Sequence, residues 1–350
     1  MSGVPDSHLE AEIAEQPEVV GHLVDALQPR VARLRSWLAG RGVTHIVLAA
    51  RGSSDNVARY GQYLLAIRGR LTVGLATPSV QTRYGVTPRM DGALVVGVSQ
   101  SGRSPDVVGV LEAARSQGRP TVAITNAPDS PLAAAADEVL HLDAGEERSV
   151  AATKTYTASL VAMAMLGLAL GDEPTGTERD DLAALPALME RTLNAPRAGA
   201  AEALVGAATL VVTGRGLNLA TAHEGALKIR ELTGMRTEAF SPPDLLHGPV
   251  AAVAAGDPVL LVAPAEPSIE DQRQLAPTLR ERGARLAVIS GDRDLLDEAD
   301  VAFALPEQPA PWLTPVTAVL PAQLVAAEMA RARGLDLDRP VGLRKVTETR

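Results

Sequence analysis

Short apolar runs rich in β-branched residues alternate with longer segments of helical periodicity along most of the chain. The runs fall into two sets of four, at residues 44–49, 93–98, 121–125 and 139–142, and then at 209–213, 258–263, 285–290 and 301–305. An order of strand, helix and strand is typical of a parallel sheet covered by helices. We therefore predict an α/β protein with two tandem doubly wound parallel-sheet lobes, each a three-layer α/β/α arrangement of flavodoxin-like type.

The second set of runs repeats the first at an offset of about 164 residues, which indicates an internal duplication. The segment Ala-Ala-Arg-Gly-Ser-Ser at 49–54 corresponds to Thr-Gly-Arg-Gly-Leu-Asn at 213–218. Between the copies, residues 171–176 form a polar break rich in glycine and proline. We expect a helical arm over 1–37, a first lobe over 38–180, a second lobe over 181–335 and a C-terminal tail over 336–350.

Composition excludes several classes of protein. Apolar residues make up 46% of the 350 residues, charged residues 21%, and the net charge is −9, which argues against extensive disorder. The acidic balance and the eight aromatic residues disfavour nucleic-acid binding. The most apolar stretch, 158–170, is shorter than the roughly 20 residues of a membrane span, and the N-terminus has no signal-peptide pattern. We expect a cytoplasmic protein with no membrane partner.

Cysteine is absent, which removes disulfides, thiolate metal sites and thiol nucleophiles. The six histidines show no metal-ligand spacing, so we expect no metal and no cofactor. Only three of the 33 basic residues are lysine: Lys154, Lys228 and Lys345. Arginine replaces lysine poorly where an amine must form an imine or act as a compact charge, so each lysine is a candidate for chemistry.

Two serine-containing loops follow predicted strands, where ligands of parallel sheets bind. One is Gly52-Ser53-Ser54, and the other is Ser99-Gln100-Ser101-Gly102 followed by Arg103, Ser104 and Pro105. Hydroxyls at a helix N-terminus suit a phosphate, although the lysine of a nucleotide P-loop is missing. The simpler interpretation is that these serines only cap helices. Two such loops in one lobe favour a small phosphorylated ligand.

The predicted helix 222–232 carries Glu224, Lys228 and Glu231 on one face, at positions i, i+4 and i+7. Spacing alone favours a ladder of ion pairs on a solvated surface. Further along, His247 ends the segment 241–247, where Asp244 is predicted to cap a single helical turn that Gly248 and Pro249 terminate. The imidazole would then lie at the negative end of that turn.

Ordered motifs along nearly the whole chain resemble the sugar isomerase (SIS) family. The resemblance is to the isomerase half of the glutamine–fructose-6-phosphate transaminases and to their shorter relatives, the amino-sugar-phosphate deaminases and isomerases. The motifs that carry it are Glu12-Ile-Ala-Glu-Gln-Pro17, Arg51-Gly-Ser-Ser54, Ser99-Gln-Ser-Gly102, Ala144-Gly-Glu146, Val150-Ala-Ala-Thr-Lys154, Gly214-Arg-Gly216, Glu224-Gly-Ala-Leu-Lys228 with Glu231, His247-Gly-Pro249 and Lys345-Val-Thr347.

The resemblance implies a sugar-phosphate site in the first lobe and catalytic groups from the second. By this resemblance Glu231 moves a proton between C1 and C2, His247 from a neighbouring subunit opens the sugar ring, and Lys345 forms an imine with the ketose. A homodimer with a shared active site is implied, and Lys228 is expected beside the reacting atoms. The expected substrate-binding residues are Gly52, Ser53, Ser54, Ser99, Gln100, Ser101, Ser104, Val150, Ala152 and Arg344.

Two departures from the transaminases bear on the reaction. The chain has no cysteine with which a glutaminase domain could release ammonia, so we expect no dependence on glutamine. Ala152-Thr153-Lys154 replaces Ser-Thr-Lys, as in the shorter deaminase relatives. We expect a deaminase and isomerase that converts glucosamine 6-phosphate to fructose 6-phosphate and ammonia. The alternatives are an aldose–ketose isomerase or deglycase of another phosphosugar, and a non-catalytic sugar-phosphate sensor.

Overall fold

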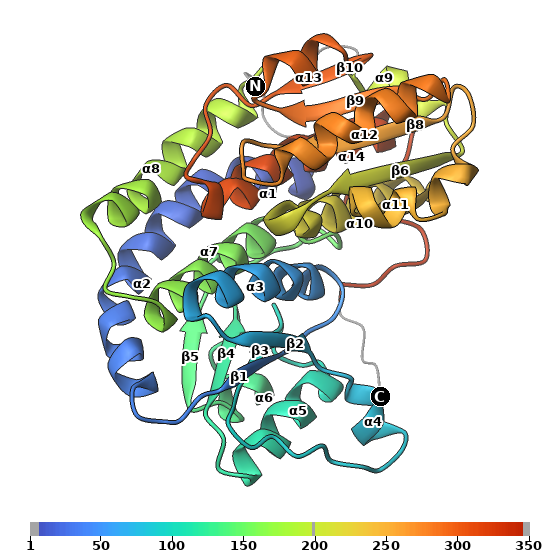
Figure 1. The fold of residues 1–350 in the computed structure, drawn as a ribbon. Helices are drawn as coiled ribbons and strands as arrows, with labels where there is room; N and C mark the ends of the chain where they lie inside the picture. The colour runs from blue at the N-terminus through green and yellow to red at the C-terminus, as the bar shows by residue number, and fades with distance from the viewer. Residues whose placement is uncertain (1–6, 198–199, 346–350) are drawn as a thin grey trace. The chain divides into compact units, whose positions relative to one another are not determined.

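Two parallel five-stranded sheets organise the chain in the computed structural model, which describes residues 7–197 and 200–345 (Figure 1). The first lobe comprises residues 18–147 and 154–183, and the second comprises the described residues of 7–17, 148–153 and 184–345. Each lobe is built on one of the two sheets. The predicted α/β class with two doubly wound lobes is confirmed.

The first lobe has the strand order β2-β1-β3-β4-β5, and all four strand pairs are parallel. This is the flavodoxin-like order, in which the chain reverses direction across the sheet between β1 and β3. The strands are β1 (His45–Ala49), β2 (Thr72–Leu75), β3 (Ala93–Val98), β4 (Thr121–Thr125) and β5 (Glu138–His141).

Helices cover both faces of the first sheet (Figure 1). One face carries α3 and α7, which pack on each other, and the other carries α5 and α6 over an apolar core that includes Val95, Leu111 and Leu132. Strands β3 and β4 are buried along their full length, because a parallel sheet covered on both sides leaves no strand face in water. The helices of this lobe are α2 (Gln16–Leu38), α3 (Ser53–Gly69), α4 (Pro78–Thr82), α5 (Pro105–Ser116), α6 (Pro131–Ala134) and α7 (Lys154–Leu170).

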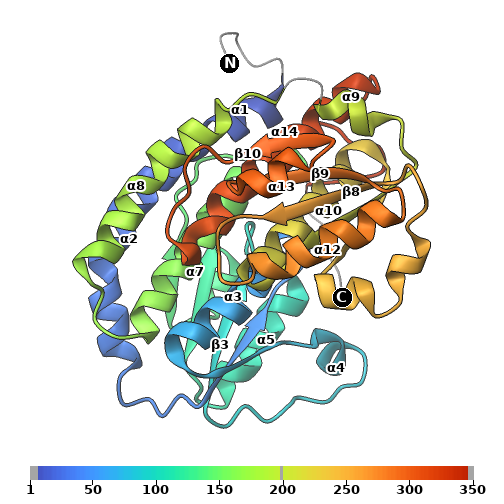
Figure 2. The ribbon, with the colours of Figure 1, turned by 45° about the horizontal axis from the view of Figure 1, so that its top comes forward.

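The second lobe repeats the same topology, with the order β10-β9-β8-β6-β7 and every pair parallel. Figure 2 shows β8, β9 and β10 of this sheet, with α12 and α13 beside them. Its strands are β6 (Thr209–Gly214), β7 (Arg236–Phe240), β8 (Pro258–Ala263), β9 (Arg285–Ser290) and β10 (Val301–Ala304). Strands β1 and β6 begin at residues 45 and 209, so the separation is the 164 residues that the sequence repeat indicates.

Helices α10 and α14 pack on each other on one face of the second sheet, as α3 and α7 do in the first lobe. A Cβ atom at Gly225 of α10 would lie only 3.2 Å from the Cβ of Ala322 in α14, so small residues allow this close approach. The helices of this lobe, with its 3₁₀ turns, are α1 (His8–Ala14), α9 (Ala200–Val205), η1 (Gly216–Asn218), α10 (Leu219–Thr233), α11 (Pro242–Leu246), η2 (Pro249–Ala252), α12 (Ile269–Glu281), α13 (Arg293–Asp297), η3 (Pro311–Leu313) and α14 (Thr314–Ala332). Helix α8 (Gly176–Leu193) runs across residue 183, where the two lobes divide.

Strands β2 and β7 are the two that the hydrophobic pattern missed. Both lie next to the first strand of their lobe, at the sheet edge, and several of their residues are exposed or half-buried. Strand β7 begins with three polar residues, Arg236 to Glu238, and the four-residue β2 contains Gly74, so neither shows the apolar signal that identified the other eight, which include the edge strands β5 and β10.

Apolar helices form the interior of both lobes. Helix α7 is buried at every residue from Lys154 to Ala169. Residues 311–332 form one helical stretch in the described part of the chain that is long and apolar enough for a bilayer, yet 94% of its apolar 18-residue window is buried within the protein. Residues 311–332 thus form a longer apolar stretch than residues 158–170, which the sequence analysis identified. Helix α10 packs against part of it.

The close approach of the α10 segment to strand β6 generates a prediction. A Cβ atom at Gly214 would lie 2.2 Å from the backbone oxygen of Asn218, which cannot move without displacing the start of α10. We expect Gly214→Ala to lower the free energy of unfolding by at least about 1–3 kcal/mol, as other overpacked sites do. Thermal denaturation measures this effect, with Gly206→Ala as the control because its Cβ meets nothing within 4 Å. Equal melting temperatures for the two variants would contradict the packing.

Candidate active site

The two serine loops of the first lobe follow adjacent strands at the point where the strand order reverses. Gly52, Ser53 and Ser54 come after β1, and residues 99–104 come after β3, the neighbour of β1 in the sheet. Ligands of open parallel sheets bind at the carboxyl ends of the strands beside this reversal. Topology therefore brings both predicted phosphate loops to the place where a ligand is expected.

The loop at 99–104 is a tight turn. The Ser99 hydroxyl oxygen accepts a hydrogen bond from the backbone N–H of Gly102 at 3.2 Å and lies 3.5 Å from the hydroxyl oxygen of Ser104. Gly102 has φ +61°, and a Cβ atom there would lie 2.0 Å from the Ser130 hydroxyl oxygen, so only glycine fits. Ser101 is half-buried and its hydroxyl oxygen accepts from the N–H of Arg103 at 3.4 Å.

Capping alone does not account for these serines. Ser104 occupies the N-cap position of α5 but makes no side-chain cap hydrogen bond, and the N-cap of α3 is Gly52, which has no side chain. Ser53 and Ser54 are the first two residues of α3 and are half-buried, as is Gln100. The serine hydroxyls therefore lie beside helix N-termini without making N-cap hydrogen bonds, an arrangement that is compatible with phosphate binding.

An ion pair that the sequence reading missed joins the two loops. The Arg51 Nε atom lies 2.6 Å from a carboxylate oxygen of Asp106, which is 3% exposed at the start of α5. Arg51 precedes one loop and Asp106 follows the other, so this pair fixes their spacing. The sequence did contain a sign of this pair, because each serine motif has a charged neighbour of opposite sign: Arg51 before the first loop and Asp106 after the second.

A buried cluster of charge lies on α10 of the second lobe. The Lys228 Nζ atom is 2.5 Å from a carboxylate oxygen of Glu231 and 3.4 Å from one of Glu224. The side chains of Lys228 and Glu224 are 1% and 0% exposed, and that of Glu231 is 24% exposed. The interpretation of these residues as a solvated surface ladder is therefore wrong, because α14 packs over this helix.

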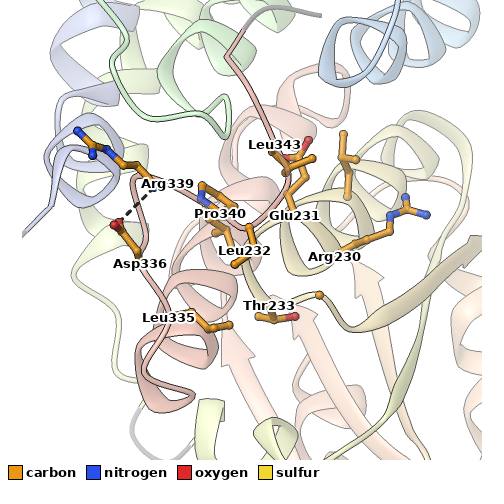
Figure 3. A pocket seen from close by; sticks show the side chains of 12 residues that line it. Arg230, Glu231, Leu232, Thr233, Leu335, Asp336, Arg339, Pro340 and Leu343 are labelled. Atoms are coloured by element: carbon orange, nitrogen blue, oxygen red, sulfur yellow. Dashed lines mark hydrogen bonds between the residues drawn. The ribbon is translucent and has the colours of Figure 1, made fainter.

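Glu231 also lines a cavity of about 380 Å³ in the second lobe (Figure 3). The end of α10 contributes Arg230, Glu231 and Thr233, and the tail contributes residues from Leu335 to Leu343. A carboxylate that is partly exposed to a cavity and held by a buried ammonium has a fixed direction and an accessible oxygen, as a general base requires.

His247 is the C-cap residue of α11 and is exposed. The predicted capping is corrected in one respect: Ser241 is the N-cap, and its hydroxyl oxygen accepts from the N–H of Asp244. Asp244 instead receives the Ser241 hydroxyl hydrogen bond at 2.5 Å. The imidazole of His247 does lie at the C-terminal end of this turn, as predicted.

Lys345 and the segment 148–153 meet in the second lobe. The Lys345 Nζ atom donates to the backbone oxygen of Ser149 at 2.7 Å. Val150 and Ala152, half-buried, lie in the same segment, and Arg344 next to Lys345 is exposed. The structure therefore brings Lys345 beside the segment that contains two of the expected substrate contacts.

The corresponding point of the second sheet holds a carboxylate that the sequence reading missed. Glu266 follows β8, is 8% exposed, and accepts hydrogen bonds from the Ser268 hydroxyl at 2.8 Å, from Asn218 and from the backbone N–H of Leu217. Burial raises the pKa of Glu266 to about 7, although these hydrogen bonds act in the opposite direction. Where the first lobe has serine hydroxyls, the second has an internal carboxylate.

Within residues 7–197 and 200–345, no group of three or more histidine, aspartate or glutamate side chains is arranged to hold a metal ion.

The fold and these motifs define an SIS protein. The SIS domain model matches residues 41–169 and again residues 203–333, one match in each lobe. The chain belongs to the SIS domain family, as the sequence motifs predicted.

The chain is similar to several proteins that are named as phosphosugar enzymes. The chain is 32% identical over 346 residues to a glutamine–fructose-6-phosphate aminotransferase (isomerizing) of Pyrococcus horikoshii, covering 95% of this chain and 56% of that protein. It thus spans little more than half the length of this curated relative. The C-terminal domain of the Francisella tularensis glucosamine-fructose-6-phosphate aminotransferase matches at 25% identity with a TM-score of 0.84, covering 97% of this chain and all of that one. A glucosamine-6-phosphate deaminase of Thermotoga maritima shares the fold at 19% identity, with a TM-score of 0.77 and coverage of 98% and 100%.

The raised pKa of Glu266 predicts a pH dependence of stability. A carboxyl whose pKa rises from 4.5 to about 7 on folding stabilises the fold below pH 4.5 and loses that contribution as the pH rises through 7. At low pH this carboxyl contributes about 3 kcal/mol to the free energy of unfolding. Glu266→Gln has no titrating group at this position and should lack this contribution. We therefore expect the difference in melting temperature, wild type minus variant, to decrease as the pH rises from about 5.5 to about 8.5. Glu281→Gln, at an exposed position in the same lobe, is the control. A difference that does not change with pH would contradict the assignment.

Proposed function

We propose that this chain converts glucosamine 6-phosphate to fructose 6-phosphate and ammonia by moving a proton between C2 and C1. The observation that carries the proposal is the buried Lys228–Glu231 pair, which leaves a partly exposed carboxylate on a cavity. A sugar-phosphate sensor would need no carboxylate held in this way.

The proposed chemistry begins on the open-chain sugar, with an aldehyde at C1 and an amine at C2. The carboxylate of Glu231 removes the proton from C2, and the C1 oxygen takes up a proton, which gives an enolamine. The proton returned to C1 leaves an imine at C2. The Lys345 amine adds to C2 of this imine and ammonia leaves. Water then hydrolyses the lysine imine, which releases fructose 6-phosphate and the free amine. The Lys228 ammonium stabilises the negative charge that develops during proton removal.

Phosphate recognition is assigned to the serine loops of the first lobe, with Ser99, Ser101 and Ser104 as donors and the loop at 52–54 beside them. Hydroxyls and a helix N-terminus bind phosphate without a basic residue. Val150, Ala152 and Arg344 are proposed as further substrate contacts.

Ring opening and imine formation are assigned to the remaining two residues. His247, exposed at the end of α11, is proposed to open the sugar ring of a neighbouring subunit in a homodimer. Lys345 is proposed to form an imine with the ketose, which a lysine can do and an arginine cannot. No cysteine is present, so the chain has no thiol with which to attack glutamine.

The direct experiment is to incubate the purified protein separately with glucosamine 6-phosphate, fructose 6-phosphate plus ammonium, and a panel of other aldose and ketose phosphates. Ammonia and sugar products are followed together. Release of ammonia from glucosamine 6-phosphate supports the proposal. Aldose–ketose conversion of another phosphosugar without ammonia would replace it with an isomerase.

The serine loop gives the first prediction for this function. Replacing Ser99 and Ser101 together with alanine removes two hydroxyl donors, each worth about 1.5–3 kcal/mol when its acceptor is charged. We expect KM for the sugar phosphate to rise at least about tenfold and inhibition by inorganic phosphate to weaken in parallel. The control is Ser116→Ala, at the far end of α5 from the loop. Unchanged KM and unchanged phosphate inhibition in the double variant would refute the site.

Glu231→Gln gives the second prediction. The amide cannot accept a proton, so kcat should fall about 10²- to 10⁴-fold while KM stays near the wild-type value. Glu224 still pairs with the Lys228 ammonium, and the amide oxygen can still accept its hydrogen bond, so the variant should fold. Melting temperature and steady-state kinetics are measured together.

The matched control is Glu238→Gln, an exposed glutamate on the edge strand β7 of the same lobe. Retention of kcat within a few-fold in folded Glu231→Gln would show that Glu231 is not the base.

A further inference from the structure

Glu12 in the N-terminal helix α1 is buried, at 3% exposure, and has no part in the chemistry described above. Its carboxylate accepts hydrogen bonds from the backbone N–H of Arg148, from the N–H of Ser149 at 3.2 Å, and from the Ser149 hydroxyl. A short helix far away in the sequence therefore satisfies two consecutive backbone donors of the segment 148–153. Buried backbone donors need such partners, because an unsatisfied one is costly.

The same peptide segment also holds Lys345. The Ser149 N–H points to Glu12, and the Ser149 backbone oxygen accepts from the Lys345 Nζ atom at 2.7 Å. The placement of that oxygen depends on the orientation of the segment that Glu12 fixes. Glu12 is thus linked to the lysine amine through one residue, Ser149.

Helix α1 is itself fixed to the tail and to α14, so it is a firm support. The Asp338 carboxylate accepts from the N–H groups of His8 at 3.0 Å and Leu9 at 2.9 Å, at the start of the helix. Glu10 pairs with Arg331 of α14 at 2.5 Å. Tail, helix α1, segment 148–153 and Lys345 therefore form a closed set of contacts within the second lobe.

We propose that Glu12 is a positioning residue that fixes the segment 148–153, and through the Ser149 carbonyl the amine of Lys345, for imine formation. This inference rests on the proposed function for its catalytic consequence, but the placement of the amine is independent of it. Glutamate is required because its two oxygens accept at least three hydrogen bonds. A glutamine would turn one of these acceptors into a donor that faces other donors.

The first arm of the test measures the lysine without any sugar. Wild type, Glu12→Gln, Ser149→Ala and Glu18→Gln are treated with a limiting amount of acetic anhydride, and acetylation is quantified at each lysine by peptide mass spectrometry. We expect Lys345 to react about fivefold faster in Glu12→Gln, as loss of one hydrogen bond implies, and less than this in Ser149→Ala. Lys228 is the internal control, because it lies on α10, outside the segment that Glu12 contacts, and general loosening would raise its rate as well.

Glu18→Gln is the matched control, because Glu18 is an exposed glutamate six residues further along the chain, near the start of α2. Its Lys345 acetylation should equal that of the wild type. If Lys345 reacts at the wild-type rate in both Glu12→Gln and Ser149→Ala, or if Lys228 reacts faster together with Lys345, the positioning role is wrong.

The second arm uses fructose 6-phosphate and borohydride to trap the imine. We expect Glu12→Gln to lower the rate of trapping at Lys345 and kcat at least about tenfold, since a displacement of the order of 1 Å can cost 10²-fold, with KM nearly unchanged. Lys345→Arg defines the background. Normal trapping in Glu12→Gln overturns the inference. If the wild type itself traps no sugar, imine formation at Lys345 fails as part of the proposed function, and the acetylation arm still decides the position of the amine.

Discussion

The ammonium group of Lys228 lies between two carboxylates on helix α10. Its burial constrains how α14 packs on this helix and where Glu231 lies. Taking an ion out of water costs roughly several kcal/mol unless partners of opposite charge surround it. Glu224 and Glu231 supply these partners one turn away on either side, at 3.4 Å and 2.5 Å. Helix α14 can then cover the helix that carries them, and Gly225 lets the two approach closely. The same ion pair holds Glu231 at the cavity wall, where the proposed proton transfer requires a carboxylate.

The two lobes share one topology but differ in what lies where the strand order reverses. In the first lobe serine hydroxyls and a helix start occupy that point, joined by the Arg51–Asp106 ion pair. In the second lobe Glu266 fills the corresponding point with its own carboxylate, bonded to the backbone of Leu217 and to Asn218. The two copies thus differ in the groups at this point, which are hydroxyls in one and an internal carboxylate in the other. The proposed division of labour assigns phosphate recognition to the copy with the hydroxyls and proton transfer to Glu231 of the other copy.

Most of the fold could be predicted from the sequence, because the central strands are buried on both faces and read as continuous apolar runs. Strands β2 and β7 could not, since β7 begins with three polar residues and the four-residue β2 contains a glycine. The motifs identified the residues on α10, but not their burial, because a spacing of i, i+4 and i+7 is the same for a surface ladder and a buried cluster. The contacts of Glu12 and Glu266 were also hidden, since each depends on partners brought together by tertiary structure. Ser241, and not Asp244, caps α11; serine and aspartate both favour the N-cap position, so residue type alone did not distinguish them.

The central claim, that this SIS protein moves a proton between adjacent carbons of a phosphosugar, is tested most directly by exchange with solvent. The wild-type protein is incubated in D₂O with fructose 6-phosphate, and separately with glucosamine 6-phosphate, and deuterium at C1 and C2 is followed by proton NMR. The account predicts that deuterium enters C1 of the ketose and C2 of the amino sugar, and that neither exchanges without protein. Tight binding of both sugars with no exchange at either carbon would contradict the account and leave a binding protein in its place.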